Sequence, residues 1–188
     1  MKSRKGEVTV SEDEGPRKVT REKLESLPTI FQKDGTVTAG NSSSLNDGAA
    51  ALVLMAKDEA EKRGLQILAK ISHHTIAGVD PLVMGIGPVP AIQKGLDSLN
   101  WTVEDLDVIE INEAFAAQYL AVEKQLKLDR SKVNVNGSGI SLGHPIGCTG
   151  SRIVVSLLHE MKRRKAKKGL ASLCVGGGMG VALFVERV

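Results

Sequence analysis

From Ala49 onward, short apolar runs alternate with longer stretches of helical periodicity, and this alternation restricts the chain to few folds. The predicted strands are ALVLMA, LQILAKISHHTIAG (one long strand or a strand pair), DVIEI, VNV, LASLCV and GVALFVERV. The predicted helices are KDEAEKRG, ended by Gly64, and PVPAIQKGLDSLN, AFAAQYLAVEKQL and SRIVVSLLHEM. This order predicts an α/β fold: a layered domain with a mixed sheet flanked by helices, whose last two strands form an antiparallel hairpin.

Three Gly-rich or turn-forming segments each carry one reactive side chain. Asn112 lies in INEAFA, where the strand DVIEI passes into a helix, and His144 lies in GHPIGCTG, after the strand VNV. Pro145 disfavours helical geometry in the residue before it, so we expect His144 to be extended ahead of a helix that begins near Cys148. Cys174 closes the strand LASLCV, and the three glycines after it allow backbone N–H groups to approach a ligand.

Each of these side chains also has an ordinary structural interpretation. An asparagine after a strand is often a helix N-cap, a histidine beside proline is commonly a hydrogen-bonded turn residue, and cysteine is a common small core residue. The combination favours a functional site, because each side chain follows its own strand at the end where open α/β sheets bind ligands. An amide, an imidazole and a thiol are the groups needed to form and stabilise a carbanion beside a thioester.

These motifs, together with KGEVTVSEDEGPR and DGTVTAGNSSSLNDGAAALVLM, resemble the C-terminal half of the thiolase family, and within it the biosynthetic acetyl-CoA acetyltransferases. The resemblance runs nearly end to end and implies a thiolase-like fold. It also implies Claisen condensation of two acetyl-CoA molecules to acetoacetyl-CoA, with thiolysis as the reverse reaction. His144 would activate a nucleophilic cysteine, and Cys174 would take a proton from the α-carbon of the second acetyl-CoA. Asn112 would hold a water that stabilises the enolate together with His144, and the backbone N–H of Gly176 would serve the other oxyanion hole.

Thiolases carry the acylated cysteine in their N-terminal half, and neither cysteine of this chain matches it. Cys174 corresponds to the acid/base, and Cys148 stands where the family commonly has a small residue such as Ala, so we interpret it as a buried filler. We therefore expect a fragment, a split-gene subunit or a truncated product that is inactive alone and needs a thiolase N-terminal half as partner.

The domain organisation is predicted from a change in composition near Gly40. Residues 1–40 are charged and interrupted by Gly15, Pro16 and Pro28, and we assign them to a remnant of the loop segment that covers coenzyme A in thiolases. Residues 41–188 are assigned to the thiolase C-terminal domain.

The resemblance also assigns substrate-binding positions. Ser43 matches the residue that meets the pantetheine arm. The apolar positions around the acyl and pantetheine tunnel are Phe31, Ala39, Leu45, Met84, Ala114 and Phe115. Core packing is an equally good interpretation for Ala39 and Leu45. The chain departs from the family pattern beside this tunnel at Ser44, Ser138 and Gly139.

Composition excludes several classes of protein. At 188 residues, with 41% hydrophobic and 25% charged residues, the chain is long enough for one domain with a full core. The net charge of +3 and the aromatic content of 3% argue against nucleic-acid binding, and we expect the basic run from Lys162 to Lys168 to be the solvated end of a helix. Neither a secretory segment nor a membrane-spanning apolar stretch is evident, so a cytoplasmic location is expected.

No metal and no cofactor are expected, because coenzyme A thioesters would be the substrates, and the family resemblance implies a homo-oligomer. GGGMG after a strand could form a dinucleotide-binding turn, but that fingerprint must open a helix, and VALFVERV is a β-type run. A metal site of His144, Cys148 and Cys174 lacks an evident fourth ligand. A ketoacyl synthase would carry a second catalytic histidine where CVGGG stands. The alternative that the sequence leaves open is a non-catalytic remnant that binds coenzyme A or dimerises.

Overall fold

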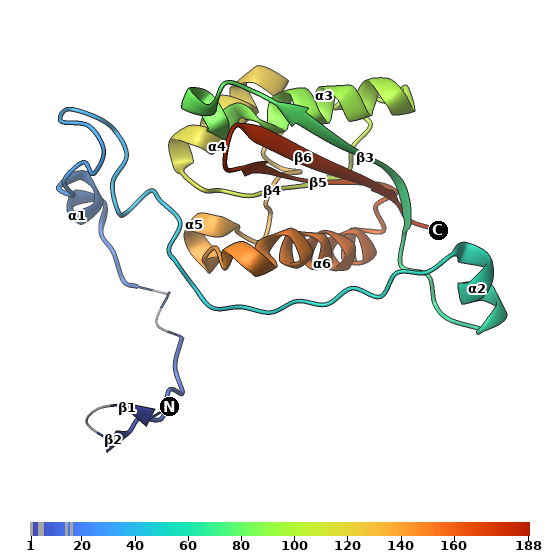
Figure 1. The fold of residues 1–188 in the computed structure, drawn as a ribbon, viewed down its shortest axis with the longest axis horizontal. Coiled ribbons are helices and arrows are strands. Elements are labelled where there is room, and N and C mark those ends of the chain that lie inside the picture. The colour runs from blue at the N-terminus through green and yellow to red at the C-terminus, as the bar shows by residue number, and fades with distance from the viewer. Residues whose placement is uncertain (1, 4–5, 14, 16) are drawn as a thin grey trace.

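In the computed structural model of the chain, described for residues 2–3, 6–13, 15 and 17–188, a four-stranded sheet lies between helices (Figure 1). Its strands are β3 (Lys70–Gly78), β4 (Val108–Ile111), β5 (Lys168–Val175) and β6 (Met179–Glu186). The order across the sheet is β3-β6-β5-β4, in which β4 and β5 are parallel and the other neighbours are antiparallel. The predicted mixed sheet and the terminal hairpin are confirmed.

Helices cover both faces of the sheet (Figure 1). One face carries α3 (Pro88–Leu99), α4 (Ala116–Leu126) and the 3-10 segment η1 (Pro81–Ile86), and the other carries α6 (Ile146–Arg164), preceded by the short α5 (Gly139–Leu142). The helix predictions for PVPAIQKGLDSLN and AFAAQYLAVEKQL are confirmed, with Pro88 in the first turn of α3, where its missing N–H costs nothing.

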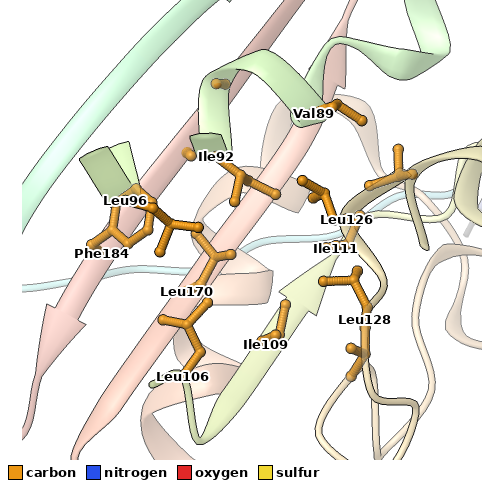
Figure 2. Close-up of a cluster of buried hydrophobic side chains, with 14 residues drawn as sticks. Val89, Ile92, Leu96, Leu106, Ile109, Ile111, Leu126, Leu128, Leu170 and Phe184 are labelled. Atoms are coloured by element: carbon orange, nitrogen blue, oxygen red, sulfur yellow. The ribbon is translucent and has the colours of Figure 1, made fainter. Parts of the chain in front are cut away.

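Strand alternation divides the core into two clusters. Alternate strand residues such as Ile109, Leu170 and Phe184 pack against α3 and α4, as Figure 2 shows, and the residues between them pack against α6. Phe184 and Ile92 are fully buried, and burying a side chain of this size contributes roughly 1.5–3 kcal/mol. The parallel pair β4 and β5 is therefore held from both sides, which gives its carboxyl ends a fixed geometry.

The prediction of a strand at ALVLMA is wrong. Residues 51–56 form no regular secondary structure, and the side chains of Val53 and Leu54 are 87% and 70% exposed. A strand of continuous apolar residues needs a hydrogen-bonded neighbour and cover on both faces. None of the described strands pairs with this segment, so it runs as an extended connection below α6 (Figure 1).

The prediction of a strand at VNV is also wrong, apart from one isolated bridge between Val133 and Ile109. Asn134 has a φ of 47°, which no strand accommodates, and its side chain takes over the pairing. Its Oδ1 accepts from the N–H of Ile111 and its Nδ2 donates to the carbonyl of the same residue, each at 2.8 Å. The backbone of β4 is thus satisfied by an amide side chain instead of a further strand.

Two boundaries differ from the sequence prediction. The long strand is shorter than LQILAKISHHTIAG, because β3 begins at Lys70. The helix after GHP, expected to begin near Cys148, begins two residues earlier at Ile146, with Pro145 as its N-cap. The basic run is divided between the last turn of α6 and the start of β5 at Lys168.

Residues before the sheet contain short elements. They are β1 (Lys2–Ser3), β2 (Gly6–Glu7), α1 (Arg21–Glu25) and α2 (Lys57–Lys62). The predicted α2 is confirmed and is followed by Gly64 at a φ of 64°, whereas α1, capped by Thr20, was not anticipated. The predicted break at Pro16 lies outside the described residues. Within the described chain, no helix combines the length and apolarity required to cross a membrane.

Candidate active site

The carboxyl ends of β4 and β5 bring Asn112 and Cys174 to one edge of the sheet. Ile111 pairs with Ser172, and the N–H of Asn112 donates to the carbonyl of Ser172 at 3.0 Å. Cys174 lies two residues further along β5. Because neighbouring strands are about 4.8 Å apart, both residues border the same small region. The expectation that each reactive residue follows its own strand is therefore met by Asn112 and Cys174, but His144 follows α5 instead.

A loop from the amino-terminal part of the chain holds His144 in place. The N–H of His144 lies 3.2 Å from the carbonyl of Ser44 and 3.2 Å from Oδ1 of Asn46, and Leu45 forms a parallel bridge with His144. Gly143, at a φ of 96°, lies directly against the Asn46 amide, where an added Cβ would collide. The predicted extended geometry of His144 is confirmed by this bridge.

The imidazole of His144 lies between Asn112 and Thr149. Its Nε2 is 3.4 Å from Nδ2 of Asn112, and its Nδ1 is 2.7 Å from Oγ1 of Thr149. Partial burial, and secondarily the charge of Arg152, lower the pKa of His144 below its usual range. The lowered pKa favours the neutral ring, in which one of the two nitrogens is an acceptor.

Asn112 is almost fully buried and is held by the backbone around it. The residue before it, Ile111, is clamped by the Asn134 side chain, and its carbonyl also accepts from Oγ of Ser138 at 3.1 Å. Oδ1 of Asn112 has no hydrogen-bond partner among the described residues and lies beside Gly139. Asn112 is not a helix N-cap, because Phe115 occupies that position of α4.

Cys174 is a free, half-buried thiol on the wall of a cavity of about 430 Å³. Burial raises the pKa of Cys174, which favours the protonated form. The predicted tunnel residues Met84, Ala114 and Phe115 also line this cavity. The remaining walls come chiefly from η1 and from Gln118 of α4, which sequence analysis did not single out.

The other predicted substrate positions lie outside the cavity. Phe31 is 73% exposed and meets the ring of Phe115 edge to face, with centroids 5.8 Å apart. The N–H of Ser43 donates to the carbonyl of Ala114 at 3.0 Å. Leu45 is 86% exposed beside His144, and Ala39 is exposed as well, so core packing does not explain either residue.

The glycines after Cys174 form the turn between β5 and β6. Gly177 and Gly178 have φ angles of 89° and 92°, and the carbonyl of Gly178 accepts from the N–H of Val79 at 2.7 Å. Gly176 is exposed, with no atom within 4 Å of an added Cβ. Because strand β6 follows this turn directly, the arrangement is not that of a dinucleotide-binding turn.

Three residues that hold the site were missed at the sequence level: Asn46, Asn134 and Thr149. Their only local signal was polarity inside or beside the recognised motifs, since each acts through a contact distant in sequence or across a helix turn.

Cys148 is buried in α6, as predicted for a filler. The part of the chain that the structure describes contains no cluster of three or more His, Cys, Asp or Glu side chains able to hold a metal ion.

Two ionisable side chains with buried polar atoms, Glu110 of β4 and Arg152 of α6, lie where these two elements pack together. Both carboxylate oxygens of Glu110 and all three guanidinium nitrogens of Arg152 are buried without a hydrogen-bond partner among the described residues. Burial raises the pKa of Glu110 to about 7, while the positive charge of Arg152 opposes this shift. Arg152 also lowers the pKa of His144, so the same guanidinium acts on both Glu110 and the imidazole.

Comparison with family models and with curated proteins matches nearly the whole chain to thiolases. The model of the thiolase C-terminal domain matches residues 65–187, and that of the thiolase N-terminal domain matches residues 1–58. The chain is 57% identical over 188 residues to acetyl-CoA acetyltransferase of Paracoccus denitrificans and 60% identical over 186 residues to that of Cupriavidus necator. These matches cover 100% and 98% of this chain but 48% and 47% of the relatives. The chain thus spans about half the length of the curated relatives it matches.

Solved structures agree with this result. The crystal structure of Bacillus anthracis acetyl-CoA acetyltransferase is 64% identical, with a TM-score of 0.93 over 100% of this chain and 48% of that one. Human mitochondrial 3-ketoacyl-CoA thiolase in complex with CoA is 44% identical, with a TM-score of 0.87 over 95% of this chain and 46% of that one. The division of this chain at residue 40 remains a prediction. Its sequence, its mixed sheet and its motifs together show that this chain belongs to the thiolase family.

Proposed function

We propose that this chain provides the acid/base and enolate-stabilising half of an acetyl-CoA acetyltransferase. The reaction would be the condensation of two acetyl-CoA molecules to acetoacetyl-CoA and the reverse thiolysis. The observation that carries this proposal is the 3.4 Å contact between Asn112 and His144 at the end of β4, beside the strand that presents Cys174. These three side chains supply an amide donor, a neutral imidazole and a thiol at one edge of the sheet.

The cysteine that carries the acyl group would come from a thiolase N-terminal half outside these 188 residues. The chain contains two cysteines, and Cys148 is buried on α6 beneath Gly48. A buried thiol packed in this way cannot attack a thioester, and Cys174 is assigned to proton transfer. The activity therefore requires two parts, of which this chain is one.

In the first half-reaction, a neutral His144 accepts the proton of the nucleophilic cysteine, whose thiolate attacks the thioester carbonyl. The N–H of Gly176 donates to the developing oxyanion. The carbon–sulfur bond to coenzyme A breaks, and the thiolate that leaves takes the proton of Cys174. The raised pKa of Cys174 suits this step, because the residue begins as a thiol and ends as a strong base.

In the second half-reaction, the Cys174 thiolate removes a proton from the α-carbon of acetyl-CoA. Protonated His144 and the water held by Asn112 stabilise the enolate oxygen. The α-carbon then attacks the acyl-cysteine, a carbon–carbon bond forms, and the cysteine thiolate departs with the proton returned by His144. Each proton taken in one half-reaction is thus given back in the other.

A coenzyme A thioester would place its acyl end in the cavity bordered by Cys174, Met84, Ala114 and Phe115. The pantetheine arm would cross Ser43, whose N–H is already engaged by Ala114. The exposed apolar residues at the approach to this cavity, Phe31, Ala39 and Leu45, would contact the arm or cover it. We further propose homo-oligomeric assembly and a cytoplasmic location, without a metal, a cofactor, a nucleic acid or a membrane as partner.

The test combines the purified chain with the portion of the Paracoccus denitrificans acetyltransferase that this chain does not match, and assays thiolysis of acetoacetyl-CoA. Turnover is expected from the mixture and not from either part alone. Cys174→Ala should abolish this turnover, and Cys148→Ala is the matched control that should retain it. Turnover by the chain alone would contradict the two-part assignment. Binding of coenzyme A by a properly reassembled mixture without turnover would instead support the non-catalytic alternative.

A further inference from the structure

We propose that Thr149 is a positioning residue that fixes the imidazole of His144 as the Nδ1–H tautomer, so that the lone pair of Nε2 faces Asn112. The inference rests on the proposed function, because it concerns the nitrogen that would take the proton of the nucleophile. Thr149 lies in the first turn of α6 and does not line the proposed substrate cavity.

The tautomer follows from counting hydrogens in one chain of contacts. Oγ1 of Thr149 lies 3.0 Å from the carbonyl of Pro145 and 2.7 Å from Nδ1 of His144, and Nδ2 of Asn112 lies 3.4 Å from Nε2. A hydroxyl has one hydrogen, a carbonyl only accepts and an amide nitrogen only donates. If Nδ1 carries the proton, His144 donates to Thr149, Thr149 donates to Pro145, and Asn112 donates to Nε2.

The opposite tautomer satisfies fewer of these contacts. With the proton on Nε2, that N–H would face the NH2 of Asn112, donor against donor. The Thr149 hydroxyl would have to turn from the Pro145 carbonyl to Nδ1. Thr149 is fully buried, so water cannot substitute for the lost contacts. With the Asn112 amide oriented as in the structure, the Nδ1–H tautomer is the one that satisfies all three contacts.

This tautomer has a chemical consequence. Nε2 then carries the lone pair that deprotonation of a nucleophile requires, and a nucleophile that approaches it would displace the long 3.4 Å contact with Asn112. An imidazole that presented Nε2–H at the same place would be a donor and could not take the proton. Thr149 would thus act on the reaction through His144 without touching the substrate.

The tautomer can be measured on the 15N-labelled chain without any turnover. Long-range 1H–15N correlation spectra distinguish protonated from unprotonated ring nitrogens, and the chain has four histidines to assign. We expect Nδ1 of His144 to be protonated in the neutral ring of the wild type. Thr149→Val removes the hydroxyl at similar volume and should shift the tautomer ratio towards Nε2–H about fivefold, which corresponds to about 1 kcal/mol for a single hydrogen bond.

The variants are chosen so that folding and tautomer can be separated. The carbonyl of Pro145 also accepts hydrogen bonds from the backbone N–H groups of Cys148 and Thr149, so it still has hydrogen-bond donors in Thr149→Val. Thr149→Ser retains a hydroxyl and should restore the wild-type ratio. The matched control is Thr75→Val: Thr75 is also buried, and its hydroxyl donates to the carbonyl of Ala91 at 2.6 Å, away from the imidazole. It should leave the His144 tautomer unchanged.

An Nε2–H tautomer in the wild type would overturn the proposal, and this measurement needs no variant. An unchanged ratio in Thr149→Val would overturn it as well. In the reassembled enzyme, Thr149→Val should lower kcat with little change in KM, and Thr149→Ser should rescue kcat. If the ratio shifts as expected but kcat does not change, the positioning role stands and the assignment of Nε2 as proton acceptor in the proposed function fails.

Discussion

Gly180 lies at the closest approach between the hairpin of Cys174 and the start of α3. On β6 it pairs with Cys174 of one neighbouring strand and with Ala77 of the other. A Cβ at this position would collide with the carbonyl group of Gly87 and would lie 2.6 Å from the nitrogen of Pro88. These are backbone atoms, so no side-chain rotation relieves the collision. We expect Gly180→Ala to force η1 and α3 away from the sheet.

The structure gives the size of this effect. Ordinary contact begins at 3.4 Å, so the Pro88 nitrogen alone must move by about 0.8 Å, and the Gly87 carbonyl by more. The movement loosens α3, whose Ile92 is fully buried against the sheet. Overpacking of this kind typically costs about 1–3 kcal/mol, and a collision with backbone belongs at the upper end, near 3 kcal/mol. Gly176→Ala, in open space on the same hairpin, should stay within about 0.5 kcal/mol.

The single tryptophan of the chain reports on this unfolding. Trp101 packs edge to face against Phe184, with ring centroids 6.2 Å apart, and Phe184 belongs to the core that α3 covers. Urea titrations followed by its fluorescence should give the free energy of unfolding for both variants. Thermal melts should show a drop of about 6–12 °C for Gly180→Ala. Equal stability of the two variants would refute the close approach of α3 to β6 described above.

Further predictions concern the site, its buried charge and association. In the reassembled enzyme, Cys174→Ala should abolish deuterium exchange at the α-carbon of acetyl-CoA while labelled acetyl incorporation persists; normal exchange would refute its role as base. Asn112→Ala should lower turnover by less than the roughly hundredfold to thousandfold cost of losing a direct oxyanion donor, since its contact runs through water; a larger loss would contradict this. Because the pKa of Glu110 is raised to about 7, folded wild-type protein should gain stability, on the order of 1–3 kcal/mol, as the pH falls from about 8 towards 5. Glu110→Gln should flatten that gain in denaturant titrations, and an identical pH profile would exclude the buried carboxyl as its source. The exposed apolar segment with Val53 and Leu54 should cause self-association detectable by light scattering, and a clean monomer at high concentration without binding of a hydrophobic dye would count against it.

Local sequence pattern was sufficient for most elements of the domain. The helix α3 and the strands β4, β5 and β6 were predicted from periodicity and from Pro and Gly at their ends, because each buries one stripe or face against a continuous core. The same kind of pattern gave a wrong strand prediction at ALVLMA. Apolar residues favour a buried strand, but the local sequence does not show whether a neighbouring strand is available to pair with it. The pattern failed again at VNV, where the Asn134 side chain replaces a ladder that the residue pattern implied.

The candidate site likewise combines residues that the sequence indicated with contacts that only the structure revealed. The sequence by itself singled out the candidate residues Asn112, His144 and Cys174, because their motifs are compact and each contains its own turn residues. Only the tertiary structure decided that Asn46 holds the backbone of His144 from a position 98 residues away and that Thr149 contacts its Nδ1. It also decided which predicted tunnel residues line the cavity and which are exposed. The physical reason is that periodicity records which face of an element is buried, whereas hydrogen-bond partners and cavity walls depend on how distant segments meet in space.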